Sequence, residues 1–350
     1  MKPLSVLVLG GTRFMGYHLV WRLLAGGHRV TLLNRGRTPD PFADRVTRLH
    51  GERAAIASLV KGLRFDAAVD FIAYTGADAA AAVEALADVG HYILISTGQV
   101  YLVREGCPRP AGEGDYDGPL LPAPEGAADR AEWDYGMGKR AAEDVLRTAC
   151  RARAFPGTVL RIPVVNGERD QSRRLEGYLW RLLDGGPLLL PQVAAADGTP
   201  AVLRHVYCHD VVRAIDAMLT GEDTLGQAYN LCQQEAPTLL ELVTLLAEGM
   251  GARPRLVEAG EEQLLDAGLE VRAVSPFSSR WISHLDPARA RAELGFHATP
   301  LAQALSSIVS SFLAHLPEHP PDGYARRADE LALARSLGHD TARGDQGGQP

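Results

Sequence analysis

A glycine-rich turn near the N-terminus joins a strand pattern to a helix pattern, in the stretch Val6-Leu-Val-Leu-Gly10-Gly11-Thr-Arg-Phe-Met-Gly16. Ser5–Leu9 has the continuous apolar character of a buried parallel strand. Phe14–Ala25 carries apolar residues at helical spacing and stops at two glycines. Glycines at such a junction let backbone amides approach a pyrophosphate at the helix N-terminus. The turn therefore predicts an α/β fold that binds a dinucleotide.

Strand and helix patterns alternate through the first half of the 350-residue chain. Further strand patterns cover Arg29–Leu33, Val46–His50, Ala67–Ala73 and Tyr92–Ser96, and an alanine-rich helix pattern covers Ala77–Val89. This order predicts a doubly wound parallel sheet of the α/β class. The hydrophobic content of 46% supports a full core, in one large domain or two closely joined lobes.

The second half of the chain has a less regular pattern. Residues 104–132 are rich in proline, glycine and acidic residues, which predicts a long loop that is a lid, a binding element or a disordered insertion. Later strand patterns cover Gly157–Val164 and Ala228–Cys232, and helix patterns cover Leu175–Leu183, Val211–Leu219, Thr238–Gly249 and Tyr324–Leu337. Asp210 is expected to cap the helix that follows it, and Asp286 a helix with Pro287 at its first position.

Tyr135 and Lys139 stand four residues apart in the stretch Tyr135-Gly-Met-Gly-Lys139. Residues at i and i+4 share one helix face, so the tyrosine hydroxyl and the ammonium can meet at one point. A nearby cation favours the phenolate, and the tyrosine could then act as a base near neutral pH. The spacing alone fits an acid/base pair, but it also occurs among surface residues of helices without a catalytic role.

Three segments in this order resemble the extended short-chain dehydrogenase/reductase family, which includes nucleotide-sugar epimerases and dehydratases: the N-terminal turn, Tyr92–Tyr101 and Tyr135–Lys139. The resemblance runs from about Leu4 to Leu313. It implies a Rossmann domain over residues 1–165 that also takes in 204–234, and a smaller substrate lobe from 166–203 and 235–316. Residues 317–350 are expected to be a partly disordered tail.

The resemblance also implies the catalytic residues. In the family, a serine or threonine after the fifth strand orients the substrate oxygen, and the spacing assigns that role to Thr97, with Ser96 as the second choice. Tyr135 is implied as the acid/base. Lys139 would bind the nicotinamide ribose and lower the pKa of the tyrosine, while a hydride passes between the substrate carbon and nicotinamide C4.

The family's usual turn, Gly-x-x-Gly-x-x-Gly, lacks its middle glycine here because Arg13 stands between Gly10 and Gly16, although Gly11 partly restores flexibility. This form, with Asn34-Arg35-Gly36 later, resembles an atypical branch that includes chloroplast stem-loop RNA-binding proteins. The expected cofactor contacts in the turn are Gly10, Gly11, Thr12, Arg13, Phe14, Met15 and Gly16.

The end of the second strand bears on the type of cofactor. An acidic residue there would bind the ribose 2′-hydroxyl of NAD. This chain has Asn34 followed by Arg35 and Arg37, and Arg13 could approach from the glycine turn. Guanidinium groups suit a 2′-phosphate, so the sequence favours NADP, with NAD as the alternative. In the family, the place of Glu52 often holds an aspartate that contacts adenine, and Ala73 would line the nicotinamide side.

Substrate contacts are expected from Ser96, Gln99, Asn166 and Arg204. The family's 4,6-dehydratases carry Asp-Glu where this chain has Gly98 and Gln99, and neither residue transfers a proton usefully at neutral pH. Epimerisation or simple oxidation and reduction therefore remain open. Nucleotide-sugar epimerases often place an asparagine where Val164 stands, so Asn166 is displaced, and Arg204 could supply one phosphate contact.

Composition and charge narrow the possible classes of function. The net charge of −7 gives no support for a nucleic-acid surface, and the longest apolar runs fall far short of the roughly 20 residues of a membrane span. Cys107, Cys150, Cys208 and Cys232 lack metal or redox spacing, and Cys208 with His205 and His209 suggests no metal site. The start of the chain shows no signal-peptide pattern, so a cytoplasmic protein is expected, with a homodimer as one option.

The leading interpretation is an NAD(P)-dependent epimerase or reductase that acts on a sugar or sugar-like secondary alcohol. A second is an RNA-binding or regulatory protein that keeps the fold, and a third is a redox-sensing scaffold that binds NADP without turnover. The presence of Thr97, Tyr135 and Lys139 favours the enzyme.

Overall fold

A computed structural model of the chain describes residues 2–192, 201–219, 221 and 223–344. The chain divides into two compact units, each built from three segments. Unit 1 comprises Met1–Gly167, Arg204–Gln234 and Ser283–Thr299, and unit 2 comprises Glu168–Leu203, Glu235–Ile282 and Pro300–Pro350. Residues 283–299 thus fall in unit 1, whereas the sequence grouped them with the substrate lobe. The substrate role of that lobe stays a prediction.

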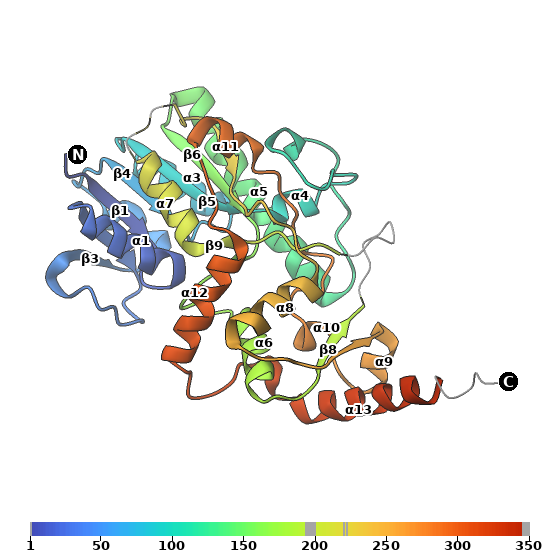
Figure 1. Ribbon diagram of the computed structural model, residues 1–350. Helices are drawn as coiled ribbons and strands as arrows, with labels where there is room; N and C mark the ends of the chain where they lie inside the picture. Colours follow the sequence, from blue (N-terminus) through green and yellow to red (C-terminus); the bar gives the residue numbers. More distant parts are fainter. Residues whose placement is uncertain (1, 193–200, 220, 222, 345–350) are drawn as a thin grey trace. The chain divides into compact units, whose positions relative to one another are not determined.

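Unit 1 is built on a seven-stranded parallel sheet in the order β10-β6-β5-β4-β1-β2-β3 (Figure 1). The strands are β1 Ser5–Leu9, β2 Arg29–Asn34, β3 Val46–His50, β4 Ala67–Asp70, β5 His91–Thr97, β6 Gly157–Ile162 and β10 Ala228–Asn230. The chain builds outward from β1 in one direction and from β4 in the other. This confirms the doubly wound α/β fold, whose ligand sites lie outside the carboxyl ends of the strands.

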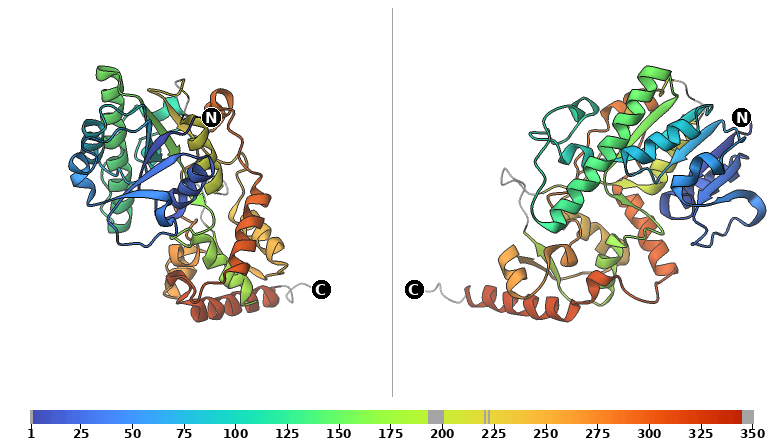
Figure 2. Two further views of the ribbon diagram at one scale, coloured as in Figure 1. Left: turned by 90° about the vertical axis from the view of Figure 1, so that its left-hand side faces the viewer. Right: turned by 180° about the vertical axis from the view of Figure 1, so that it is seen from behind.

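Helices cover both faces of this sheet (Figure 2). α3 (Gly76–Ala85) and α5 (Ala127–Arg153) pack together on one face, and α1 (Phe14–Ala25) packs against α7 (Cys208–Met218) on the other. Every residue of β4 and β5 is buried, as expected for central parallel strands. Unit 1 also contains α2 (Ile56–Leu59), α4 (Gln99–Leu102), α11 (Ala288–Leu294) and the short pair β7 (Val165–Asn166) and β9 (Val206–Tyr207).

Unit 2 is mainly helical. Its elements are α6 Arg174–Leu183, α8 Leu239–Met250, α9 Glu261–Asp266, α10 Val271–Val274, α12 Leu301–Ala314, α13 Arg327–Gly344 and the parallel pair β8 Leu188–Pro191 and β11 Leu256–Ala259. A buried ion pair between Arg181 and Glu330 ties α13 to α6. The C-terminal tail is therefore part of unit 2 as far as Gly344, and the predicted disorder of the last six residues lies outside the described residues.

Several predicted boundaries were wrong for local reasons. The long loop ends at Gly126, because α5 begins at Ala127 and not after residue 132. β4 stops at Asp70, whose carboxylate accepts a 2.9 Å hydrogen bond from the amide of Ile72 and turns the chain. The C-terminal helix begins at Arg327 and not at Tyr324.

Two predicted helix caps also differ from the structure. Asp210 lies inside α7, and its carboxylate accepts hydrogen bonds from the amide and the hydroxyl of Thr299, at 2.8 and 2.6 Å, instead of capping the helix. Asp286 does accept from the amide of Ala288, at 2.9 Å, but α11 begins at that residue, so Pro287 stands at the cap and not at the first helical position.

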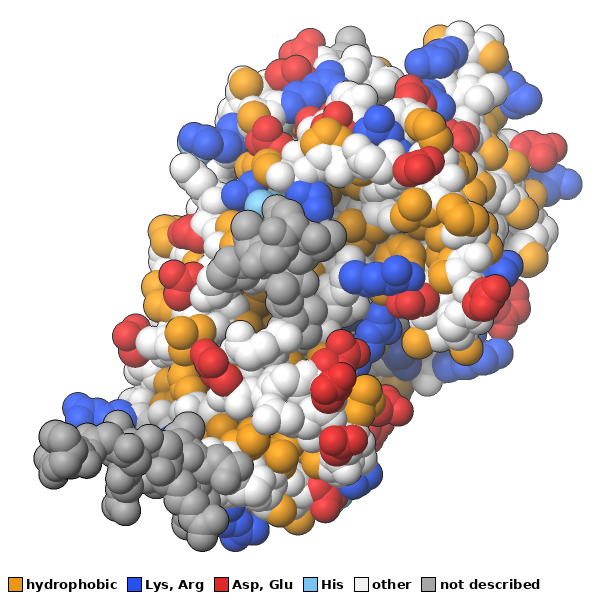
Figure 3. Space-filling model, turned by 90° about the vertical axis from the view of Figure 1, so that its right-hand side faces the viewer, with side chains coloured by type: hydrophobic (Ala, Val, Ile, Leu, Met, Phe, Trp, Pro, Cys, Tyr) orange, Lys and Arg blue, Asp and Glu red, His pale blue; other side chains and the backbone are white. Residues whose placement is uncertain are grey.

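The face of the molecule in Figure 3 carries acidic and basic side chains close to one another, without an extended patch of either sign among its described residues. Such a surface lacks the basic stripe that binds phosphate backbones. None of the helices in the described part of the chain is both long and apolar enough to cross a membrane.

Candidate active site

The N-terminal glycine turn has the close backbone approach that a pyrophosphate site needs. Gly10 has φ +90°, a conformation that L side chains rarely adopt. A Cβ at Gly16 would lie 2.4 Å from the carbonyl oxygen of Gly10, so only glycine lets α1 start this close to the turn. Arg13 is the N-cap of α1 and makes no side-chain capping bond. The turn and the first helical residues therefore fit a pyrophosphate, which backbone amides at a helix N-terminus can hold.

The segment after β2 carries the residues that were predicted to choose the cofactor. The Asn34 side chain accepts a 2.8 Å hydrogen bond from the amide of Gly36, and Arg35 is exposed. The guanidinium of Arg13 donates to Thr38 Oγ1 at 2.9 and 3.1 Å, so the structure does bring Arg13 to this segment. Arg13, from the glycine turn, is thus held against the segment that follows β2.

Two predicted cofactor residues pair with each other. Arg37 Nη2 lies 3.0 Å from Glu52 Oε1, and both side chains are more than half exposed. An exposed pair of this kind adds little stability, typically about 0–1 kcal/mol, and opens readily. Both groups can therefore turn to a ligand at low cost.

Lys139 is buried against β5 and the segment that follows β4. Its ammonium donates hydrogen bonds to the carbonyl oxygens of Ala73, at 2.8 Å, and Ile95, at 2.6 Å. The side chain is 2% exposed, and burial lowers the pKa of Lys139 to about 8, although the nearby charges of Asp70 and Glu143 act in the opposite direction. The ammonium also lies 5.3 Å from the ring centroid of Tyr74. A cation is thus held just beneath the carboxyl edge of the sheet.

The two glycines between Tyr135 and Lys139 let α5 lie directly on the backbone of the segments after β4 and β5. A Cβ at Gly136 would lie 3.0 Å from the carbonyl oxygen of Gln99, and a Cβ at Gly138 would lie 2.6 Å from that of Tyr74. Tyr135, next to the first glycine, is 38% exposed, and its ring centroid is 6.4 Å from that of Tyr74. Tyr135 therefore lies beside the segment that follows β4.

The end of β5 holds the other predicted catalytic residues. Thr97 is buried, and its Oγ1 accepts a 3.2 Å hydrogen bond from the amide of Gln99. The amide side chain of Gln99 donates to Glu132 of α5 at 2.6 Å. Ser96 donates a very short hydrogen bond to Glu143 of α5, so its hydroxyl is engaged inside the protein. Thr97 is thus the better placed of the two hydroxyl candidates.

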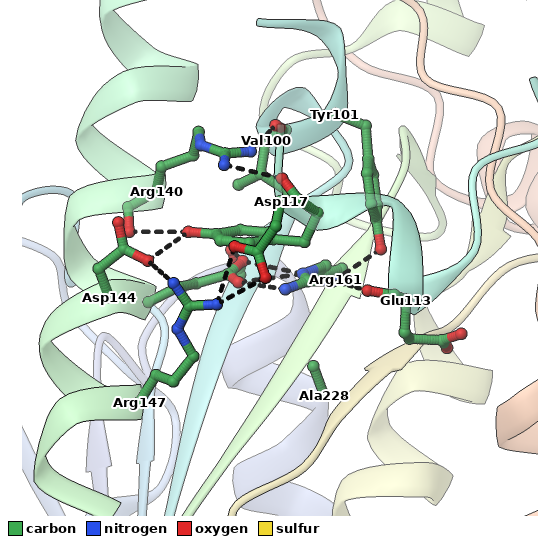
Figure 4. Close-up of polar contacts among 12 residues, drawn as sticks. Val100, Tyr101, Glu113, Asp117, Arg140, Asp144, Arg147, Arg161 and Ala228 are labelled. Carbon is green, nitrogen blue, oxygen red and sulfur yellow. Dashed lines mark hydrogen bonds and ion pairs between the residues drawn. The ribbon is translucent and has the colours of Figure 1, made fainter. Parts of the chain in front are cut away.

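Arg161 is the centre of a buried ionic network, whose polar contacts are drawn in Figure 4. Arg161 of β6 pairs with Glu143 at 2.7 Å, both side chains being at most 5% exposed, and donates to the hydroxyl of Tyr101 at 2.7 Å. The guanidiniums of Arg140 and Arg161 lie 3.9 and 4.4 Å from the ring centroid of Tyr116. Tyr116 belongs to the long segment 104–126, so this network fixes that segment to α5 and β6.

Sequence reasoning assigned no role to Glu143. A signal was available, since Glu143 follows Lys139 by four residues and so shares its helix face. The pairing with Arg161 had no local signal, because the two residues come from different elements.

The remaining substrate candidates, Asn166 and Arg204, also lie in unit 1. Asn166 Nδ2 lies 2.7 Å from His205 Nδ1, while its buried Oδ1 has no hydrogen-bond partner among the described residues. Arg204 donates to the carbonyl oxygens of Leu285 and Gln234, at 2.8 and 3.4 Å. Arg204 thus holds backbone, which competes with the phosphate contact expected of it.

The chain is similar to several known proteins. Residues 6–232 match the model of the NAD dependent epimerase/dehydratase family. The chain is 26% identical over 275 residues to the 2'-dehydrokanamycin reductase of Streptomyces kanamyceticus. The aligned region covers 75% of this chain and 73% of that protein. It is 32% identical over 114 residues to the chloroplast stem-loop binding protein of 41 kDa b of Arabidopsis thaliana, 28% of this chain and 30% of the relative.

Among solved structures, the UDP-glucose 4-epimerase of Thermus thermophilus in complex with NAD is similar, with a TM-score of 0.67 and 21% identity over 89% of this chain and 100% of that chain. At this identity the likeness shows the fold.

Proposed function

Because the chain belongs to the NAD dependent epimerase/dehydratase family, we propose that it transfers a hydride between a nicotinamide dinucleotide and a secondary alcohol or ketone of a sugar-like substrate. The family match confirms the resemblance to extended short-chain dehydrogenases/reductases. The observation that carries the proposal is the seating of α5, where Gly136 and Gly138 lie against the carbonyls of Gln99 and Tyr74. It supports the proposal together with the contacts of the motif, because Lys139 donates to the carbonyl oxygens of Ala73 and Ile95 and Tyr135 lies beside Tyr74.

Tyr135 is proposed as the acid/base. Tyr135 is partly exposed, so a substrate oxygen could approach it and exchange a proton with its hydroxyl. When bound, the dinucleotide would accept or supply the hydride at its nicotinamide ring. The proton and the hydride then leave or reach the same carbon–oxygen group, which interconverts alcohol and ketone.

Lys139 and Thr97 are proposed to support this step. The buried ammonium of Lys139 would favour the phenolate form of Tyr135 and offer a hydrogen bond to the ribose. Thr97 would orient the substrate oxygen with its hydroxyl. Gly98 and Gln99, which follow Thr97, supply no proton donor for elimination of water, so the proposed chemistry ends with hydride transfer.

NADP is the proposed cofactor. Asn34 provides no carboxylate for the ribose 2′-hydroxyl, whereas Arg13 and Arg35 bring positive charge to the end of β2. A 2′-phosphate pairs well with guanidinium groups. NAD is the alternative, since the family is named for it.

Reduction of a ketone is the proposed direction of the chemistry, with epimerisation as the alternative. The relative that aligns with 75% of this chain is named as a reductase. A reductase needs a net supply of reduced dinucleotide, whereas an epimerase returns the hydride to the same substrate and consumes none.

A screen that follows both the absorbance of the nicotinamide and the products would test the proposal. The purified chain would be incubated with NADPH or NADH and with keto-sugars, sugar-derived ketones and nucleotide sugars. Oxidation of the dinucleotide in step with alcohol formation supports a reductase, and a new epimer without net oxidation supports an epimerase. A protein that binds a dinucleotide but turns over no compound of either class contradicts the proposal and favours a non-catalytic or RNA-binding role.

A further inference from the structure

Three potential metal ligands of unit 1 lie together where α1 packs against α7. They are His18 of α1 and Cys208 and His209 at the start of α7. One ring nitrogen of each histidine and the sulfur of the cysteine lie within 4.8 Å of one another. The two imidazole ring centroids are 4.4 Å apart. We propose that these three side chains bind a first-row transition metal ion, with Zn²⁺ as the preferred ion.

The helices that carry these ligands are held together independently of any ion. Arg22, one turn after His18 on α1, donates a 2.7 Å hydrogen bond to Asp216 of α7. Both helices also pack on the same face of the sheet. The backbone positions of the three ligands are therefore fixed before an ion arrives, which lowers the entropic cost of binding.

The cysteine sits in a confined position. Cys208 is fully buried, and a Cβ at Gly167 would lie only 2.2 Å from its sulfur. Only glycine lets the chain pass this close to the thiol. His18 and His209 are half-buried, so water and ions can reach their rings.

The donor set and its spacing suit Zn²⁺. Zn–N bonds of about 2.0–2.1 Å and Zn–S bonds of about 2.3 Å place tetrahedral ligand atoms roughly 3.3–3.6 Å apart. The ligand atoms lie within 4.8 Å of one another, and small side-chain rotations would bring them to that spacing. One thiolate with two imidazoles favours zinc over the hard ions magnesium and calcium. Binding would release the thiol proton of Cys208 to solvent, since the thiolate is the ligand.

The cysteine and histidine spacing in the sequence predicted no such site, because His18 is far from the other two ligands along the chain. The fold brings them together beside the glycine turn. Phe14, the first residue of α1, lies 3.3 Å from the Cβ position of Gly167, and that position also contacts Cys208. The ion would thus cross-link α1 to α7 next to the turn, and the inference does not depend on the proposed reaction.

The test uses the full-length protein after treatment with a chelator. Zinc chloride alone would be titrated by calorimetry in two buffers with different ionisation enthalpies, and Co²⁺ would be added separately as a spectroscopic probe. We expect one zinc per chain, release of about one proton and a higher melting temperature. With Co²⁺ we expect a thiolate-to-metal charge-transfer band and the strong visible bands of a tetrahedral site.

Three ligand variants and two controls decide the assignment. Cys208→Ser should abolish the charge-transfer band. His18→Gln and His209→Gln should each weaken zinc binding by roughly 100-fold or more, because mutation of a residue that only hydrogen-bonds to a metal ligand already lowers metal affinity by about 10- to 100-fold. Cys150→Ser and His315→Gln, which change other residues of the same types, should bind zinc like the wild type.

Absence of zinc binding at micromolar concentrations would overturn the proposal. So would unchanged affinity in His18→Gln and His209→Gln, or a charge-transfer band that depends on Cys150. Circular dichroism of each variant would establish that it is folded. The two histidine variants keep the test valid if Cys208→Ser does not fold, because their side chains are only half-buried.

Discussion

The ammonium of Lys139 donates a 2.6 Å hydrogen bond to the carbonyl oxygen of Ile95, which joins the middle of α5 to the interior of β5. Two residues after Ile95 the strand ends at Thr97, and four residues before Lys139 the helix carries Tyr135. The bond therefore fixes the register between the strand and the helix that hold the proposed catalytic hydroxyls. Loss of the lysine should disturb the relative positions of both hydroxyls as well as the charge near them.

Tyr135→Phe should lower turnover by roughly 100- to 10,000-fold, the usual contribution of a positioned acid/base, because it keeps the ring and removes the proton donor. Dinucleotide affinity should change little. Tyr74→Phe is the matched control, since it removes the hydroxyl of the neighbouring ring, and it should keep turnover within a few-fold of the wild type. Steady-state rates with a substrate from the screen would measure both. Wild-type turnover by Tyr135→Phe would refute the catalytic assignment.

Gly16→Ala should abolish dinucleotide binding. The new methyl group would lie 2.4 Å from the carbonyl oxygen of Gly10, so α1 must move away from the turn. Gly114→Ala is the control, because no atom lies within 4 Å of its Cβ position. Calorimetric titration with NADP and NAD would compare the two variants. Retained affinity in Gly16→Ala would place the pyrophosphate elsewhere.

Arg35→Ala should weaken NADP binding selectively, by about 1–3 kcal/mol for a lost charged hydrogen bond, and leave NAD binding nearly unchanged. Arg29→Ala changes an exposed arginine at the opposite end of β2 and should affect neither cofactor. Binding constants for both dinucleotides with all three proteins provide the comparison. Tighter binding of NAD than of NADP by the wild type would show that the arginines do not select the cofactor.

The stability of the cofactor-free protein should rise with pH between about 8 and 10.5, relative to that of Lys139→Met. Burial lowers the pKa of Lys139 to about 8 in the folded state, from 10.5 in the unfolded chain. Between these values the unfolded chain binds more protons, so raising the pH favours folding, by about 3 kcal/mol at most. Below pH 8 the cost of the buried charge is fully present. Chemical denaturation across this range would measure the slope.

Lys61→Met, which changes an exposed lysine, serves as the control for that experiment and should follow the wild-type curve. Parallel curves for the wild type and Lys139→Met would mean that the buried lysine does not titrate in this range.

Arg161→Met should destabilise the protein by about 3–5 kcal/mol, because it leaves the buried carboxylate of Glu143 without its partner. The double variant Glu143→Met with Arg161→Met should be less destabilised than the single one. Arg64→Met, which breaks an exposed pair with Asp88, should cost less than about 1 kcal/mol. Urea unfolding would rank the three variants, and equal stabilities of Arg161→Met and Arg64→Met would contradict the role of the network.

The order of strands and helices in unit 1 could be predicted because each element has a local signal. β5 contains the apolar run Tyr92–Ile95, α1 stops at glycines, and Gly16 marks a close contact between helix and turn. Thr97 and Lys139 could be chosen because their spacing along the chain is a property of single elements.

Long-range interactions had no such signal. The buried pair of Arg161 and Glu143 forms only when β6 meets α5, and a lone arginine in an apolar strand does not reveal its partner. The cap predicted for Asp210 failed because Thr299, far along the chain, takes both carboxylate oxygens. The long segment 104–126 appeared irregular because its order comes from Tyr116 packing under two arginines of other elements.

The interleaving of the two units along the chain has a consequence for synthesis on the ribosome. The edge strand β10 is near residue 230, and the backbone hydrogen bonds of Ala111 with His284 and Asp286 need chain that comes later still. Unit 1 therefore cannot fold completely when only its first segment has left the ribosome, because its other two segments have not yet been made. A nascent chain of about the first 167 residues would expose the edge of β6, an open template for pairing with another strand. Interrupted translation should release a fragment that aggregates or is held by chaperones, and neither unit can be produced by simple truncation from either end.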